Sequence, residues 1–255
     1  VFAVADFNFA DADTGDALES VRIDTLPTDG KLFYKGAEVT GVITVTAAEL
    51  IAGDLVFTPD ADENGTTYAT FSYSVNDGDV FAAASATMTV DVDPVNDAPV
   101  ASTTDSVTVN EDATSVALSP TAPSDVDGDT LTINITQVPT PAQGTVTYTP
   151  DGGGTATLTA TSSLSETEFA TLTFTPTADY DGTVNSITYT VDDGTATPVA
   201  GSIALALTGS NDAPTVTGTV TTSTPEDDAP SSVDLLAGAA DIDGDTLNAS
   251  GVTRV

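Results

Sequence analysis

The stretch LTFTPTADYDGTVNSITYTVDDG, residues 172–194, decides the fold of this chain. In its second half, Ile187, Tyr189 and Val191 alternate with Thr residues. An alternation of period two places the apolar side chains on one face of a β-strand and the polar side chains on the other. The stretch therefore predicts a strand that is buried on one side, followed by a tight Asp-Gly turn.

The same pattern occurs a second time. The stretch LVFTPDADENGTTYATFSYSVNDG, residues 55–78, corresponds to residues 172–194, and the phrase NDAP at residues 96–99 recurs at residues 211–214. The period of about 115 residues is longer than the ~20 to 50 residues of a solenoid repeat. Acidic phrases beginning at residues 11, 125 and 241 mark the same point in three successive units.

These repeats predict three domains. We expect residues 1–97 to be a repeat that lacks its N-terminal strand, residues 98–212 to be a complete repeat, and residues 213–255 to be the beginning of a third. We also expect the sequence to be a segment of a longer protein.

Short strands are indicated throughout each repeat. TLTINITQV, GTVTYTP and SIALALT alternate in the same way and are separated by clusters of Gly, Pro, Asp and Asn. About seven such strands in ~100 residues are typical of an immunoglobulin-like sandwich. The candidates for helix are TAAELIAG and SLSETEFA, each long enough for one or two turns. We predict an all-β protein made of tandem immunoglobulin-like Greek-key β-sandwiches joined end to end.

The charge of the chain restricts its partners. The 255 residues include 39 Asp and Glu and 4 Lys and Arg, giving a net charge of −35. Nucleic acid and anionic membrane surfaces are excluded as partners because the Lys and Arg that would contact phosphates are missing. No apolar run approaches the ~20 residues that span a bilayer. Cations are the partners that this charge favours, although part of the acidity also suits a solvated surface in saline surroundings.

The absence of two residue types restricts the chemistry. The chain has no Cys and no His, which rules out disulfides, thiolate and imidazole metal sites, and Ser-His-Asp or Cys-His catalysis. A pair of carboxylates of the glycosidase kind stays open. However, the acidic residues recur with the repeat, and an active site rarely needs a copy in every module. We expect a protein that is not an enzyme.

The carboxylates gather in the loops between the predicted strands and not along them. In the strand order of a sandwich, the DxDGD loop and the DG turn lie at one end of a domain, and the ADxxG loop and the linker lie at the other. Stacking repeats end to end would bring six or more carboxylates together at each junction. At ~5 Å and an effective dielectric constant of 20, each like-charged pair costs roughly 3 kcal/mol. The candidate ligands are Asp11, Asp13, Asp62, Glu63, Asp93, Asn96, Asp97, Glu111, Asp125, Asp127, Asp129, Asp179, Asp181, Asp193, Asn211, Asp212, Asp241, Asp243 and Asp245.

Calcium is the ion that suits these ligands. Hard divalent cations prefer oxygen ligands, and Ca²⁺ accepts several carboxylates with backbone carbonyls in an irregular cage. An EF-hand is a rival interpretation of DVDGD, but its twelfth position would need Glu and holds Thr136. A single Asp-Gly pair is often only a turn, because Asp bonds its own backbone and Gly accepts positive φ. For Asp77 and Asp193 both interpretations stay open.

With these motifs, the chain resembles the cadherin-like tandem repeats of large bacterial surface adhesins. The resemblance covers essentially the whole chain. It implies that Asp93, Asn96 and Asp97 are linker ligands, joined by Asp62 and Glu63 upstream and by Asp125 and Asp127 downstream. It also implies that Glu111 serves the following junction and that Asp193 reaches back to the preceding one. The chain departs from the family pattern at Thr208, which stands where the first linker has Asp93, and in the acidic phrase at residues 11–16, which contains one extra residue.

The resemblance implies a structural role. We expect extender repeats of a secreted or cell-surface bacterial adhesin, stiffened by Ca²⁺ at the junctions between neighbouring repeats, with the first junction binding more tightly than the second. One alternative is homotypic lateral assembly into an extracellular sheath, surface layer or filament. A second is a carbohydrate-binding accessory module of a secreted enzyme.

Overall fold

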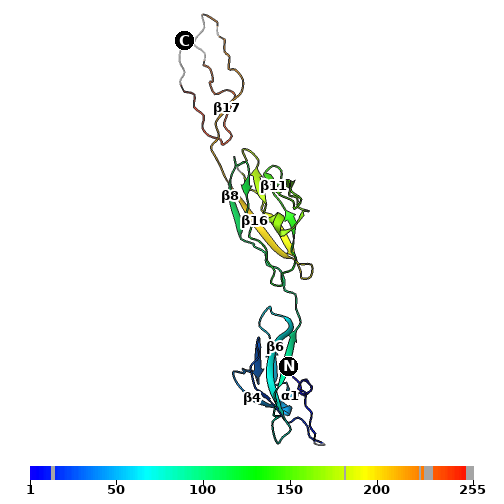
Figure 1. Cartoon of the computed structure of the whole chain (residues 1–255). Coiled ribbons are helices and arrows are strands. Elements are labelled where there is room, and N and C mark those ends of the chain that lie inside the picture. Colours follow the sequence, from blue (N-terminus) through cyan, green and yellow to red (C-terminus); the bar gives the residue numbers. More distant parts are fainter. Residues whose placement is uncertain (13–14, 181, 224, 227–231, 251–255) are drawn as a thin grey trace. The chain divides into compact units, whose positions relative to one another are not determined.

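The structure is a computed structural model that describes residues 1–12, 15–180, 182–223, 225–226 and 232–250. It divides into two compact units, Val1–Asp97 (unit 1) and Ala98–Val255 (unit 2). Each unit is a β-sandwich, as the strand arrows of Figure 1 show. Among the described residues, the helices are all too short to cross a membrane.

Unit 1 contains two sheets. Strands β4, β1, β6 and β7 form one sheet in that order, and β3, β2 and β5 form the other. All the pairings are antiparallel. The elements are η1 (Val4–Asp6), β1 (Ser20–Ile23), β2 (Lys31–Tyr34), β3 (Ala37–Glu38), β4 (Ile43–Thr46), α1 (Ala47–Ala52), β5 (Leu55–Thr58), β6 (Gly65–Asn76) and β7 (Ala86–Val92).

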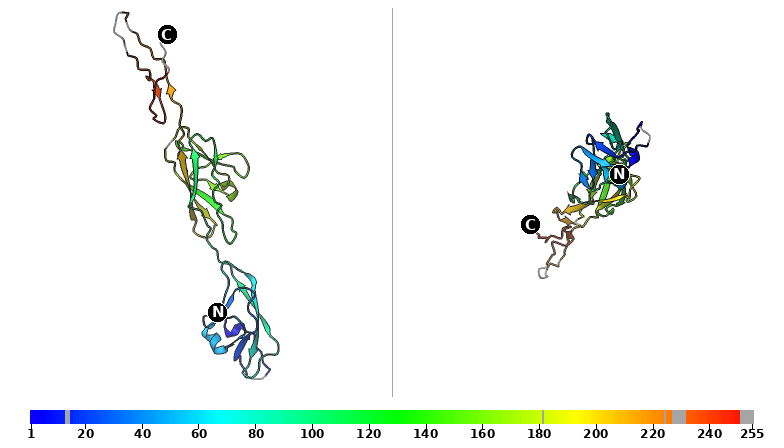
Figure 2. Two further views of the ribbon diagram at one scale, coloured as in Figure 1. Left: turned by 90° about the vertical axis from the view of Figure 1, so that its left-hand side faces the viewer. Right: turned by 90° about the horizontal axis from the view of Figure 1, so that it is seen from below.

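Unit 2 has the same plan with more strands. One sheet has the order β13, β10, β15, β16 and β8, and the other has the order β12, β11, β14 and β9. Strand β8 runs parallel to β16, and Figure 2 shows them side by side in green and yellow. The elements are β8 (Asp105–Asn110), β9 (Val116–Ala117), β10 (Thr132–Gln137), β11 (Gly144–Tyr148), β12 (Ala156–Thr157), β13 (Ser163–Leu164), α2 (Glu166–Phe169), β14 (Thr173–Pro176), β15 (Ile187–Asp192), β16 (Val199–Thr208), β17 (Thr215–Val216) and β18 (Ala239–Ala240).

The alternation read from the sequence sets the core of both units. In β15, Ile187, Tyr189 and Val191 are buried, and the Thr residues between them are half-buried. The corresponding residues Phe71 and Tyr73 of β6 are buried in unit 1. The predicted all-β fold of antiparallel sandwiches is confirmed, and β8 beside β16 is its one parallel pairing among the described strands.

Both helical candidates form short helices. Each begins with a reciprocal capping box: in α1 the Thr46 hydroxyl accepts from the Glu49 N–H, and the Glu49 carboxylate accepts from the Thr46 N–H. Ser165 and Glu168 do the same in α2. Capping boxes satisfy backbone donors that have no partner at a helix N-terminus. Both helices precede the strand with the FTP phrase, as the sequence predicts; β14 ends at Pro176, whereas β5 ends at Thr58, one residue before Pro59.

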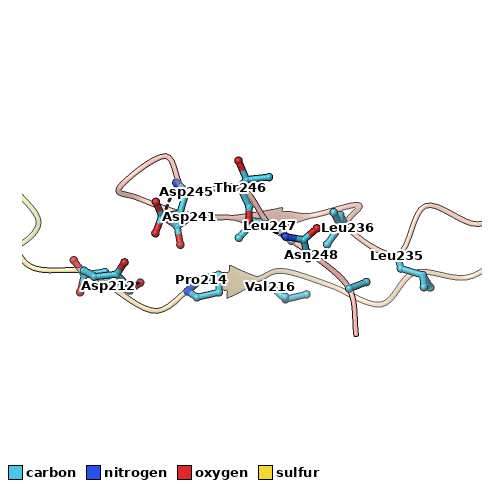
Figure 3. A pocket seen from close by; sticks show the side chains of 13 residues that line it. Asp212, Pro214, Val216, Leu235, Leu236, Asp241, Asp245, Thr246, Leu247 and Asn248 are labelled. Carbon is cyan, nitrogen blue, oxygen red and sulfur yellow. Dashed lines mark hydrogen bonds between the residues drawn. The ribbon is translucent and has the colours of Figure 1, made fainter. Parts of the chain in front are cut away.

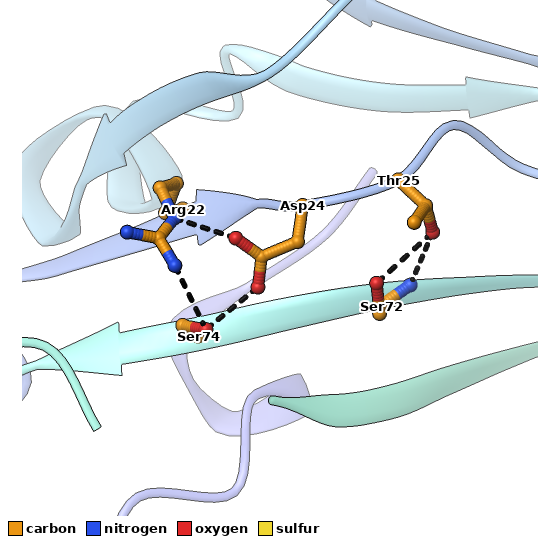
Figure 4. A network of polar contacts seen from close by, with 5 residues as sticks. All are labelled: Arg22, Asp24, Thr25, Ser72 and Ser74. Carbon is orange, nitrogen blue, oxygen red and sulfur yellow. Dashed lines mark hydrogen bonds and ion pairs between the residues drawn. The ribbon is translucent and has the colours of Figure 1, made fainter. Parts of the chain in front are cut away.

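A polar network links β1 and β6 in unit 1 (Figure 4). Ser74, which is 3% exposed, donates to Asp24 Oδ2 over 2.6 Å, and the Arg22 guanidinium donates to Asp24 Oδ1 and to Ser74. Burial raises the pKa of Asp24, but the hydrogen bonds from Ser74 and Arg22 outweigh it, so that this pKa lies below its ordinary value. Thr25 accepts from the N–H and hydroxyl of Ser72 in the same way. The polar groups of this network therefore have partners.

The C-terminal residues belong to unit 2. In the described part of residues 213–250, the strands are β17 and β18, which pair antiparallel at Thr215 with Ala240 and at Val216 with Ala239. The division of the chain into three repeats, with a boundary after residue 212, stays a prediction.

Candidate metal centre

Asp212, in the second linker, is the centre of the largest carboxylate cluster among the residues that the structure describes. Its oxygens lie within 4.8 Å of carboxylate oxygens of Glu111 and Asp243, and a second group with the same spacing joins Asp212 to Asp112 and Asp179. We call these five residues the Asp212 cluster. They come from four separate segments of unit 2: the β8–β9 loop, the β14–β15 loop, the linker after β16, and the loop after β18.

Strand pairing explains how Glu111 reaches the linker. Strand β8 ends at Asn110, which pairs with Thr208 at the end of β16, and the Glu111 N–H donates to the Thr208 carbonyl over 3.2 Å. Glu111 is only 2% exposed, and its carboxylate accepts a hydrogen bond from the Ser210 N–H. A buried carboxylate is therefore held against the first residues of the linker.

The Asp212 side chain lacks a complete set of partners. Its Oδ2 atom is buried, and in the structure it has no hydrogen-bond partner. Its own N–H donates to Asp243 Oδ2 over 2.6 Å, which fixes the linker against the loop after β18. The great majority of buried polar atoms in proteins are hydrogen-bonded, so this exception marks a place where a bound water or cation would fit.

Repulsion within the cluster shifts the protonation of Asp212. Burial raises the pKa of Asp212, and the charges of Asp112, Asp179, Asp243 and Glu111 raise it further. Both causes disfavour the charged form. A cation bound among these oxygens would offset both and favour the charged form.

A second group lies in the DVDGD loop of unit 2. Carboxylate oxygens of Asp125, Asp127 and Asp129 lie within 4.8 Å of one another. Asp125 Oδ1 accepts from the Asp127 N–H over 2.9 Å, which folds the loop around this carboxylate, while Asp125 Oδ2 is buried without a hydrogen-bond partner. The carboxylates of the alternating Asp residues are thus close together, and their binding of an ion stays a prediction.

The third copy of this loop is folded in a similar way. Asp241 Oδ1 accepts from the Asp245 N–H over 3.1 Å, as Asp125 accepts from Asp129 over 3.5 Å. Asp212 faces Asp241 and Asp245 across a pocket of about 430 Å³ (Figure 3). Asp243 instead joins the Asp212 cluster.

The two linkers share one local conformation. The Asn96 amide donates to the Asp97 carbonyl over 2.6 Å, and the Asn211 amide donates to the Asp212 carbonyl over 2.9 Å. The NDAP phrase therefore makes the same hydrogen bond, from the Asn side chain to the next carbonyl, in both linkers. Asp93 is exposed in the first linker.

The ADxxG loops also share a conformation. Asp62 and Asp179 both have positive φ, 60° and 59°, a region in which Asp is enriched. Glu63 beside Asp62 accepts a hydrogen bond from the Tyr68 hydroxyl, which raises the pKa of Tyr68. The predicted first junction draws Asp62, Glu63 and the first linker from unit 1 and other ligands from unit 2, so its assembly stays a prediction.

The carboxylates of the DG turns have a structural role. Asp193 Oδ1 accepts from the N–H groups of Thr195 and Ala196, both over 2.8 Å. Asp77 Oδ1 accepts from Val80 and Asp79, and these backbone bonds hold the pKa of Asp77 below its ordinary value. The turn interpretation is thus visible at both positions, and a further ligand role for Asp193 stays a prediction.

The remaining candidates divide into two groups. Asp13 and Asp181 lie outside the described residues, and Asp11 is exposed in unit 1. One cluster member, Asp112, was missed at the sequence level. Its signal was available, since the acidic pair Glu111–Asp112 recurs as Glu226–Asp227 in the sequence.

The donors of both clusters suit a hard cation. They are carboxylate oxygens, which Ca²⁺ takes together with backbone carbonyls and waters in sites of six to eight oxygens. The unpartnered, buried Oδ2 atoms of Asp125 and Asp212 fit this chemistry. The residues present thus fit a divalent cation at each cluster.

Comparison with known proteins identifies the domain type. The sequence profile of the family described as "Bacterial Ig domain" matches residues 96–205. Domains of this kind are typical of surface or secreted proteins. No curated protein matches the chain.

Two of the similar solved structures are endo-fucoidan hydrolases of glycoside hydrolase family 107. For MfFcnA4 the identity is 20%, the TM-score is 0.27, and the alignment covers 77% of this chain and 24% of that one. For MfFcnA9 the identity is 17%, the TM-score is 0.23, and the coverage is 72% and 27%. The chain thus spans about a quarter of the length of these enzymes.

From the profile match and the sandwich topology together, residues 96–205 of this chain form a bacterial Ig-like domain.

Proposed function

We propose that this chain is a series of calcium-stiffened extender repeats of a secreted or cell-surface bacterial adhesin. The observation that carries the proposal is the Asp212 cluster. In it, a linker carboxylate with a buried, unpartnered oxygen lies among four further carboxylates. One of these four, Glu111, is only 2% exposed. The role in adhesion rests on the resemblance to cadherin-like adhesin repeats. The bacterial Ig-like domain at residues 96–205 also supports it, because domains of this kind are typical of surface or secreted proteins.

The position of the cluster supports a mechanical role for the ion. The linker after β16 carries Asp212, while the other ligands belong to loops on the sandwich and on the β17–β18 segment. Without a cation, like charges push these segments apart. With Ca²⁺ bound, the same carboxylates would pull the linker onto the loops on both sides and restrict its bending. For the first linker, the same role is proposed on its sequence alone.

Calcium fits better than magnesium. Ca²⁺ accepts many carboxylates in an irregular arrangement, whereas Mg²⁺ demands near-ideal octahedral geometry and keeps several waters. Weak extracellular sites with dissociation constants of ~10⁻⁴ M would be filled at ~10 mM Ca²⁺, which stabilises the folded state by roughly 2.7 kcal/mol per site. We propose no catalytic role, because the sequence lacks His and Cys and its acidic groups recur with the repeat.

Calcium titration of the purified chain tests the proposal. Isothermal calorimetry should show Ca²⁺ binding to the wild type, and thermal unfolding should occur at higher temperature in Ca²⁺ than in EDTA. Asp212→Asn should lose part of both effects. Asp29→Asn is the charge-matched control, since Asp29 is exposed and lies outside both clusters.

Two results would contradict the calcium site. One is an equal melting temperature of the wild type in Ca²⁺ and in EDTA at constant ionic strength. The other is an equal loss of binding in the Asp29 and Asp212 variants, because it would mean that the cation responds only to net charge.

A further inference from the structure

Asn64 and Gly65 form the one Asn-Gly pair in the sequence. Asn64 lies in the loop after β5, and β6 begins at Gly65. Asn64 is exposed, as are Glu63 before it and Thr66 two residues after it. Asn is one of the thermally labile residues, and its amide is most labile before Gly, because a residue without a side chain leaves the approach to the amide carbon open. The pair is therefore a candidate for a reaction of the chain with itself.

The Asn64 side chain is free to take part in such a reaction. Among the described residues, none forms a hydrogen bond with this side chain. Other Asn side chains are held in place: Asn76 Oδ1 accepts from the Gly78 N–H over 2.9 Å, and Asn110 Oδ1 accepts from the Asp112 N–H over 2.9 Å. The Asn64 amide can thus turn toward its own backbone without breaking a hydrogen bond.

The backbone at the start of β6 is irregular. Gly65 pairs with Val92 of β7, but the register shifts before the next pair, Ala69 with Val90. Gly65 and Thr67 both have positive φ, 151° and 56°. An irregularity of this kind disrupts the ladder, and a strand end outside the regular ladder opens at small cost. A Cβ built at Gly65 would meet nothing within 4 Å, so there is room for a ring at this position.

We propose that the Asn64–Gly65 pair is a site of spontaneous deamidation. The Gly65 nitrogen attacks Cγ of Asn64, so that the N–Cγ bond forms, the Cγ–Nδ2 bond breaks, and ammonia leaves with the proton that the Gly65 nitrogen loses. The product is a five-membered succinimide ring. Water then opens the ring at either carbonyl, which leaves aspartate or isoaspartate at residue 64. The reaction consumes water alone and needs no oxidant, reductant or enzyme.

The reaction changes the charge and the backbone of the ADxxG loop in unit 1. A carboxylate replaces an amide directly after Asp62 and Glu63. In the sequence of the next repeat, the residue that corresponds to Asn64 is Asp181. The aspartate product therefore has the residue type that the next repeat encodes, whereas the isoaspartate product adds a methylene to the backbone just before β6. New and aged copies of the chain differ at this one loop.

The test follows the purified full chain in EDTA at pH 7 and at pH 9, with mass spectrometry of its chymotryptic peptides. We expect residue 64 to lose its amide as ammonia appears in solution, and to do so faster at pH 9, because the attacking nitrogen must lose a proton. In water enriched in ¹⁸O, the product should contain the label, since ring opening takes its oxygen from water. Labelling by an isoaspartate methyltransferase should detect the isoaspartate product.

A pair of amide-conserving variants assigns the reaction to Asn64. In Asn64→Gln the ring would have six members, which form more slowly, so the release of ammonia should fall at least tenfold. Asn185→Gln is the matched control, because Asn185 is also exposed but precedes Ser186, and its rate should equal that of the wild type. Circular dichroism checks that both variants fold like the wild type.

A free peptide with the sequence DADENGTTY of residues 60–68 gives the rate in the absence of the fold. Because the folded chain leaves the amide unheld, it should react at no less than a tenth of the rate of the peptide. A slower reaction overturns the proposal, since the fold would then protect the pair. Equal ammonia release from the wild type and Asn64→Gln also overturns it, as does loss of an amide that maps to another Asn.

Discussion

Asp212 shows how one side chain can be costly without a ligand and useful with one. Burial and four neighbouring carboxylates raise its pKa, so in metal-free protein its charge destabilises the folded state. The sign of the pH effect follows: the cost is full above the raised folded pKa, shrinks as the pH falls below it, and is gone below the unfolded pKa of about 3.9.

We therefore predict that Asp212→Asn stabilises unit 2 in EDTA at pH 7, opposite to its effect in Ca²⁺. The increase in stability over the wild type should be smaller at pH 4, because protonated Asp212 resembles Asn. Calorimetry of thermal unfolding at both pH values measures this difference in stability. A variant that is less stable than the wild type in EDTA would show that Asp212 is a structural partner and not an unfilled ligand.

Asp105, at the start of β8, has the reverse behaviour. Burial raises its pKa, but hydrogen bonds outweigh this: the N–H and hydroxyl of Thr121 donate over 2.8 and 2.7 Å, and the Ser102 hydroxyl donates over 2.9 Å. The pKa of Asp105 is therefore below its ordinary value. Its stabilising effect is present above the unfolded pKa of about 3.9 and is lost as the pH falls through the lower folded value.

We predict that Asp105→Asn destabilises unit 2 by about 1 kcal/mol at pH 7, allowing for its partial exposure. The difference from the wild type should be smaller at pH 3 than at pH 7, because pH 3 lies below the unfolded pKa of about 3.9. Urea unfolding curves at the two pH values give both numbers. A difference that is independent of pH would mean that the Asp105 charge is not what the hydrogen bonds recognise.

At the scale of elements, the pairing of β15 with β16 depends on one glycine. Gly201 lies opposite Tyr189, and a Cβ at this position would collide with the Tyr189 ring. The ring is buried against Phe169 of α2, 4.8 Å between centroids, and its hydroxyl donates to the Ser102 carbonyl over 3.2 Å. The ring therefore has no room to move away.

We predict that Gly201→Ala destabilises unit 2 by about 1 to 3 kcal/mol, the usual cost of overpacking a core. Gly152→Ala is the matched control, because a Cβ there meets nothing within 4 Å. Chemical denaturation of both variants measures the difference. Equal stabilities would show that β15 and Tyr189 rearrange at little cost.

For the whole molecule, the net charge of −35 sets the conditions under which calcium acts. Self-repulsion destabilises a compact state, and salt screens it, the Debye length falling from about 30 Å at 0.01 M to about 8 Å at 0.15 M. NaCl should therefore raise the melting temperature of the EDTA-treated chain gradually.

We predict that a few millimolar Ca²⁺ raises the melting temperature beyond NaCl or Mg²⁺ of the same ionic strength, and that it narrows the distribution of maximum dimensions in small-angle scattering. Equal responses to the three salts would reduce the role of calcium to screening. An unchanged scattering curve together with a raised melting temperature would mean that Ca²⁺ binds to the chain but does not stiffen it.

The sequence by itself determined the strand pattern, the repeat and the acidic loops. These follow from local rules: period-two alternation in residues 187–191 fixes which side chains are buried, and Asp-Gly phrases fix the turns. The missed member Asp112 had a local signal as well, since it directly follows Glu111 and the acidic pair recurs in the next repeat.

Only the tertiary structure decided which acidic residues meet. Asp112, Asp179, Asp212 and Asp243 are far apart along the chain, and strand pairing in unit 2 brings their oxygens together while Asp193 serves its own turn. Sequence patterns report the faces of each strand, whereas its neighbours depend on pairings between distant segments.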